Sequence, residues 1–108
     1  MKKGIFLGDK KQIDSVYPEA LRAALGESCA LESAVFTKEA VLRDPARFAD
    51  TGYIFSTWGM PAFAEQEIAA CFPRLRAVFY AAGTVQAFAR PFLSRGVQVF
   101  SAWAANAC

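Results

Sequence analysis

Five short runs of β-branched and aromatic residues most constrain the fold of this chain. Each run is nearly continuous in apolar residues, whereas a strand with one face in water alternates apolar and polar side chains. We therefore expect strands that are buried on both faces, as in a parallel sheet covered by helices. The expected strands cover residues 4–7, 34–36, 53–57, 77–81 and 97–101.

Helix signals lie between these runs. Pro18 and Gly26 bracket apolar residues spaced by three and four, and Asp44 with Pro45 is typical of a helix start. The expected helices cover residues 19–25, 45–49, 65–72 and 85–94, the last with Pro91 as a residue that kinks or shortens it. The segment 8–14 is expected to be a charged loop. Alternating strands and helices predict an α/β fold, a flavodoxin-like open parallel sheet of five strands in the order 2-1-3-4-5 with helices on both faces.

Composition narrows the class of protein. The chain has 108 residues, enough for a single domain, and 55% of them are hydrophobic. The net charge of +2 is scattered along the chain, so we expect no nucleic acid partner. No apolar run is long enough to span a bilayer or to act as a signal peptide, and we expect a cytoplasmic protein without membrane contact.

The chain offers little for catalysis by itself. It has no histidine, and its three cysteines, Cys29, Cys71 and Cys108, show no C-x-x-C spacing. We therefore expect free thiols, no metal site and no catalytic residue in this chain.

The loops that follow the expected strands exclude several classes of site. Residues 8–14 lack the spaced glycines of a dinucleotide loop and the pattern of a P-loop. The third strand ends in Ser56 and Thr57 without an acid, which argues against a receiver domain. The small residues Ala81, Ala82 and Gly83 would let backbone amides approach a carboxylate at a helix start, or they form a tight turn for packing reasons alone.

Three stretches, residues 55–61, 75–86 and 96–107, resemble in order and spacing the substrate-binding domain of NAD-dependent D-isomer-specific 2-hydroxyacid dehydrogenases. The resemblance spans nearly the whole chain. It implies that amides at Gly83 and Thr84 hold a substrate carboxylate. It also implies that Trp58, Gly59, Met60 and Asn106 line the same pocket.

The chain departs from the family at residues 82–86, where Ala82, Thr84 and Gln86 stand in place of the common glycine, glycine and aspartate. The family's nucleotide-binding domain, with its catalytic histidine, would lie beyond Cys108. We therefore expect residues 1–108 to be a truncated substrate-binding lobe that is inactive and binds no NAD alone, although NAD would serve the full-length enzyme.

Two functions follow. The first is a lobe of an oxidoreductase that transfers hydride between NAD(H) and a 2-hydroxy or 2-oxo acid. The alternative is a free-standing flavodoxin-like interaction module without catalysis. In either case we expect uncovered apolar surface near Trp103 and a homodimer formed through it.

Overall fold

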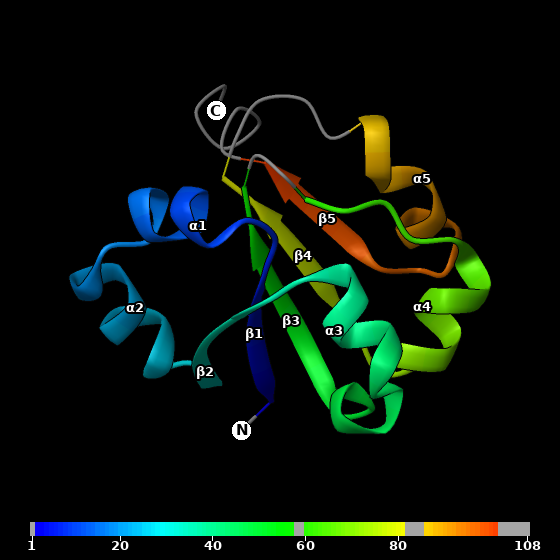
Figure 1. Cartoon of the computed structure of the whole chain (residues 1–108), viewed down its shortest axis with the longest axis horizontal. Helices are drawn as coiled ribbons and strands as arrows, with labels where there is room; N and C mark the ends of the chain where they lie inside the picture. Colours follow the sequence, from blue (N-terminus) through cyan, green and yellow to red (C-terminus); the bar gives the residue numbers. More distant parts are fainter. Residues whose placement is uncertain (1, 58–59, 82–85, 102–108) are drawn as a thin grey trace.

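The sheet of this protein is parallel and open, with helices on both of its faces (Figure 1). The structure is a computed structural model that describes residues 2–57, 60–81 and 86–101. Its five strands lie in the order β2-β1-β3-β4-β5. They are β1 (Lys3–Leu7), β2 (Ala30–Phe36), β3 (Thr51–Ser56), β4 (Ala77–Tyr80) and β5 (Gln98–Ser101). The predicted α/β class is thus confirmed.

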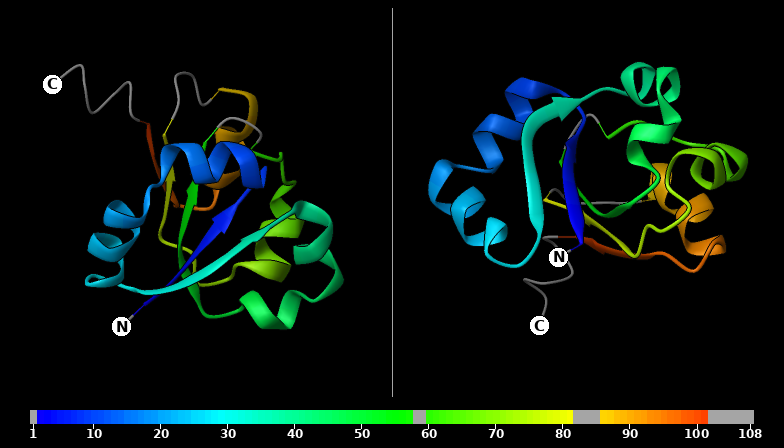
Figure 2. Two further views of the ribbon diagram at one scale, coloured as in Figure 1. Left: turned by 60° about the vertical axis from the view of Figure 1, so that its left-hand side comes forward. Right: turned by 90° about the horizontal axis from the view of Figure 1, so that it is seen from below.

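The helices form two unequal layers (Figure 2). One layer contains α1 (Lys10–Val16) and α2 (Glu19–Gly26), which connect β1 to β2. The other contains α3 (Lys38–Arg43), the 3-10 helix η1 (Pro45–Phe48), α4 (Glu65–Cys71) and α5 (Gln86–Ser94). Within the described residues, no helix has the length and apolar character needed to cross a bilayer.

The prediction of a charged loop at residues 8–14 is wrong, because α1 begins at Lys10. The Asp9 side chain accepts a hydrogen bond from the Lys11 amide at 3.2 Å and so caps the helix. Lys10 and Asp14 form an ion pair at 2.6 Å across one turn. Ile13 is the one buried residue of α1, and a single buried side chain leaves little hydrophobic periodicity in the sequence.

Three other segments also differ from the sequence expectations. Helix α3 was not expected; it is short and begins at Lys38, and the hydroxyl of the preceding Thr37 caps it by accepting a hydrogen bond from the Ala40 amide at 3.2 Å. Asp44 makes no side-chain cap for the 3-10 helix that follows it. Pro91 lies inside α5, and the helix continues through it to Ser94.

The larger hydrophobic cluster lies between the sheet and the α3, α4 and α5 layer. It includes Ile54 and Val78 from the sheet with Phe48, Phe72 and Phe92 from the helical side, all nearly inaccessible to water. The rings contact one another edge to face, for example Phe48 and Phe72 with centroids 5.9 Å apart. This packing makes one side of the sheet the main core of the protein.

The smaller cluster, beneath α1 and α2, reaches only part of the opposite face. Phenylalanines of four strands share one register there: Phe6 pairs with Phe55, Phe55 with Phe79 and Phe79 with Phe100. Phe6 and Phe55 are buried, Phe79 is half-buried and Phe100 is 46% exposed. The helical layer therefore ends over the middle of the sheet.

Candidate functional site

The candidate site lies at the carboxyl edge of the sheet, where β3 and β4 end side by side. The Ala81 amide donates to the Ser56 carbonyl at 2.8 Å, and the Thr57 hydroxyl donates to the Ala81 carbonyl at 3.2 Å. Thr57 and Ala81 directly precede segments 58–59 and 82–85. In open α/β sheets ligands bind beyond the carboxyl ends of the strands, so this edge is the expected position for a site.

Two further hydroxyls fix the same edge. Ser56 donates to the Leu7 carbonyl at 2.5 Å, which ties β3 to β1. The Tyr17 hydroxyl lies within hydrogen-bonding distance of the Ser56 carbonyl at 2.8 Å and the Phe79 carbonyl at 3.3 Å. Burial raises the pKa of Tyr17, so this phenol remains a neutral donor at pH 7. Because these hydroxyls bond to backbone carbonyls, we assign them a positioning role rather than a nucleophilic one.

The chain after β3 is held from the neighbouring helical layer. The Lys38 ammonium, at the start of α3, donates to the Ala62 carbonyl at 2.6 Å and lies 3.4 Å from Glu67. Glu67 also accepts the Ala64 amide at 2.8 Å. The Ala64 hydrogen bond first, and Lys38 second, lower the pKa of Glu67. The Lys38 nitrogen also lies over the ring of Phe63, 5.4 Å from the ring centroid.

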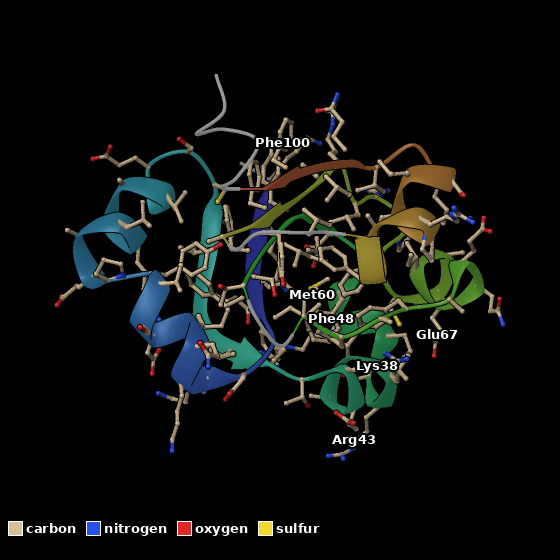
Figure 3. The ribbon with its side chains drawn as sticks, turned by 90° about the horizontal axis from the view of Figure 1, so that it is seen from above. Lys38, Arg43, Phe48, Met60, Glu67 and Phe100 are labelled. Carbon is tan, nitrogen blue, oxygen red and sulfur yellow. The ribbon has the colours of Figure 1, made fainter. Side chains whose placement is uncertain are left out.

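Among the predicted site residues, only Met60 can be placed. Its amide donates to the Thr57 carbonyl at 3.0 Å, which keeps it at the carboxyl edge of β3. Its half-buried side chain packs against the larger hydrophobic cluster, as Figure 3 shows from above. Trp58, Gly59, Gly83, Thr84 and Asn106 lie outside the described residues.

Sequence reasoning missed Tyr17 and Lys38. Tyr17 stands between two helices and reaches strands that follow it by 39 and 62 residues, a contact that no local pattern marks. Lys38 carried a weak signal, since it comes just after the apolar run that ends at Phe36 and would therefore lie at the carboxyl edge. A charged residue at a strand end is common enough that this signal alone selects nothing.

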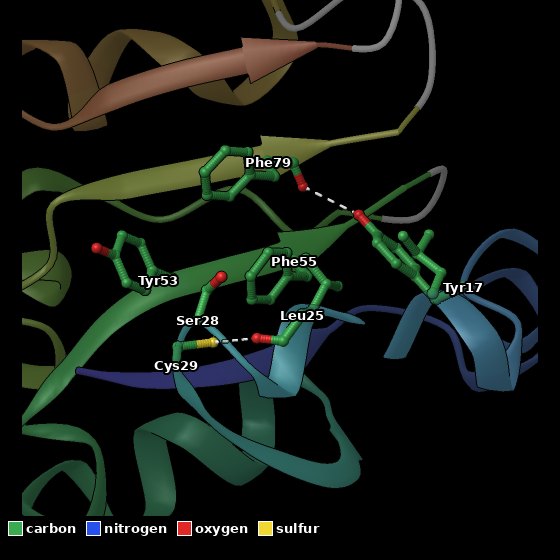
Figure 4. Close-up of a pocket in the computed structure, with 8 residues that line it drawn as sticks. Tyr17, Leu25, Ser28, Cys29, Tyr53, Phe55 and Phe79 are labelled. Atoms are coloured by element: carbon green, nitrogen blue, oxygen red, sulfur yellow. Dashed lines mark hydrogen bonds between the residues drawn. The ribbon is translucent and has the colours of Figure 1, made fainter. Parts of the chain in front are cut away.

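A hollow lies between α2 and the face of the sheet beneath it (Figure 4). It has a volume of about 410 Å³ and is walled by apolar and aromatic side chains. The Cys29 thiol donates to the Leu25 carbonyl at 3.4 Å, and burial raises the pKa of this thiol. The lining residues are Tyr17, Leu21, Leu25, Ser28, Cys29, Tyr53, Phe55 and Phe79.

Comparisons with protein-family models, with curated proteins and with solved structures found no match to this chain. Within residues 2–57, 60–81 and 86–101, no group of three or more cysteine, aspartate or glutamate side chains is placed to hold a metal ion.

Proposed function

We propose that the carboxyl edge of β3 and β4 binds the carboxylate of a small 2-hydroxy or 2-oxo acid. On this proposal the chain is the substrate-binding lobe of an oxidoreductase that transfers hydride between NAD(H) and that acid. One observation supports it above the others: Thr57 and Ala81, which precede the two segments implicated by the family resemblance, are hydrogen-bonded to each other.

Rigid anchors suit this role. A carboxylate held by backbone amides is bound most tightly when the amides already point to one place, because the chain then loses little freedom on binding. Ser56, Thr57 and Tyr17 supply such anchors at the ends of three strands. NAD would supply the hydride chemistry, and we assign none of the described residues to hydride or proton transfer.

Backbone NMR of the ¹⁵N-labelled chain tests the carboxylate site. Lactate and pyruvate should shift the amides of residues 57–60 and 81–86, with dissociation constants on the order of millimolar for such small ligands. Lactamide and pyruvamide are the matched neutral probes and should leave these amides unchanged. Equal shifts with acid and amide, or shifts confined to other parts of the chain, would contradict the proposal.

Two threonines of one segment give a matched pair of variants for this titration. Thr57→Val removes the hydroxyl that joins β3 to the Ala81 carbonyl, so we expect lactate binding to weaken by roughly 3- to 10-fold. Thr51→Val makes the same chemical change at the opposite end of β3, where the hydroxyl finds no hydrogen-bond partner among the described residues. It should leave the dissociation constant unchanged.

A free-standing interaction module is the second candidate function. The observation that favours it is the exposed end of the phenylalanine row, where Phe100 is 46% exposed. The two functions use different surfaces, since the acid would bind at the carboxyl edge and a partner on the sheet face. The NMR titration therefore judges the first function without assuming the second.

A further inference from the structure

Helix α2 has an unusually exposed apolar surface. It contains eight residues, none of which is buried, although five of them are alanine or leucine. Ala20, Ala23 and Ala24 are exposed and Leu21 is 40% exposed. A surface helix normally buries one apolar stripe against its own core and presents polar residues outside. Leu21 and Leu25 line the hollow between α2 and the sheet, and the exposed alanines leave the rest of this helix without a polar outer stripe. The outer surface of α2 therefore has the character of a helix that packs on something further.

The half of the sheet formed by β4 and β5 lacks a covering helix on the same face. On the face that carries α1 and α2, Phe79 of β4 is half-buried and Gln98 and Phe100 of β5 are exposed, and none of these is charged. Phe79 and Phe100 stack with ring centroids 5.2 Å apart and planes inclined by 14°. The described residues place no helix over this half of the sheet (Figure 2).

We propose that a second copy of this chain covers the half-sheet, with α2 of each copy packed on β4 and β5 of the other. Such an interface is self-complementary, because each copy has a projecting apolar helix next to an uncovered aromatic surface. A twofold axis parallel to the strands achieves this exchange. The α1 and α2 layers of the two copies would then lie side by side in one shared layer between the two sheets.

Charged residues at the edge of the proposed interface fit the same twofold arrangement. Glu27 follows α2 at the amino edge of the sheet, just before β2 begins, and Arg76 directly precedes β4 at that edge. Neither side chain makes an ion pair within the part of the chain that the structure describes. An axis parallel to the strands keeps both amino edges at the same end, so Glu27 of one copy would approach Arg76 of the other. Opposite charges at a rim favour this register over others.

Sedimentation equilibrium over a concentration series tests the dimer. The wild-type chain should dimerise with a dissociation constant of roughly 1 to 100 μM, as expected for a small surface without a large core. Ala23→Glu places a charge on the side of α2 opposite Leu21 and Leu25 while keeping a good helix former, and it should weaken dimerisation by about 10-fold or more. Leu93→Glu is the matched control, since Leu93 is 56% exposed on α5 in the other layer, and it should dimerise like the wild type. A wild-type chain that stays monomeric at about 100 μM would overturn the proposal, as would a dimer disrupted only by Leu93→Glu.

Reversing the rim charges tests the orientation of the two copies. Glu27→Arg and Arg76→Glu should each weaken the dimer by about 3- to 10-fold, and the double variant should recover most of this loss. Circular dichroism of the monomers confirms that each variant is folded. Losses that simply add in the double variant would overturn the parallel twofold arrangement. This inference is independent of the proposed acid-binding function, because neither charge lies at the carboxyl edge.

Discussion

The two faces of the sheet are built in different ways. The face under α3, α4 and α5 is closed by many large side chains, including five phenylalanine rings that form a continuous series of contacts. The face under α1 and α2 has a small cluster of five buried residues, and α2 adds none to it. The first face thus contributes most of the buried apolar side chains. The second face has few of them and relies also on hydrogen bonds at the carboxyl edge.

This difference separates stability from interaction. Substitutions in a closed core lower stability because neither water nor a partner replaces the lost contacts. Substitutions on a half-covered face change what can bind there at little cost to the monomer. Both surfaces that we propose to be functional border the thinner helical layer, which contains α1 and α2. Tyr17 of this layer supports the carboxyl edge, and α2 flanks the exposed phenylalanines.

The largest expected effect is a loss of stability in the closed core. Phe72 is 1% exposed and contacts Phe48 and Phe63. Phe72→Ala should lower the free energy of unfolding by about 3 to 5 kcal/mol. Phe100→Ala, on the other face, should lower it by less than about 1 kcal/mol in dilute protein that is monomeric. Urea denaturation of the two variants provides the comparison.

Phe72→Ala could leave too little stability to measure, so Phe72→Leu serves as the milder variant with the same expected order. Similar losses for Phe72→Leu and Phe100→Ala would show that both faces contribute equally to the monomer. That result would contradict the division between a closed face and a partly covered one.

The next effect concerns Tyr17, which joins the thinner layer to β3 and β4. Tyr17→Phe should lower the free energy of unfolding by about 1 kcal/mol at pH 7, because it removes a buried hydrogen-bond donor. Burial raises the pKa of Tyr17 above its ordinary value of 10.0, so folding favours the neutral phenol. The contribution of the neutral Tyr17 phenol to stability is fully present below pH 10. As the pH rises further, the free energy of unfolding should fall by up to about 1.4 kcal/mol per pH unit.

Urea midpoints between pH 8 and pH 11 measure this dependence. The wild type should lose stability above pH 10 more steeply than Tyr17→Phe. Tyr53→Phe is the control, since it removes a hydroxyl from a half-buried ring on the same face, and it should retain the wild-type slope. Equal slopes for the wild type and Tyr17→Phe would show that the phenol is not held neutral by the fold.

The sequence predicted the sheet better than the helices. Strands such as β1 and β3 are buried on both faces, so their apolar runs are continuous and easy to recognise. Helix α1 has only Ile13 buried, so hydrophobic periodicity marks it poorly. Helix α2 was predicted from its apolar residues spaced by three and four, although none of its residues is buried. Gly26, expected to follow α2, is its last residue, a difference of the size usual at helix ends.

The candidate site was predictable only in its position. The rule that ligands bind beyond the carboxyl ends of parallel strands directs attention to Thr57 and Ala81 without any structure. The support from Tyr17 and Lys38 arises from long-range contacts, which depend on how the layers pack rather than on neighbouring residues. The roles of Trp58, Gly59, Gly83, Thr84 and Asn106 remain predictions from the family resemblance.

The smallest effect concerns β3, the central strand that both layers share. Thr51 is completely buried, yet its hydroxyl has no hydrogen-bond partner among the described residues. Thr51→Val keeps the shape of the side chain and removes an unsatisfied polar atom, so it should raise the free energy of unfolding by up to about 1 kcal/mol. Thr57→Val should lower it by about the same amount, because the Ala81 carbonyl loses its donor. Thermal and urea unfolding of both variants show directly whether the free energy of unfolding rises in one and falls in the other. If both variants gained stability, the hydroxyl contacts at the carboxyl edge would not hold the thinner side together, and burial alone would explain the difference between the two faces.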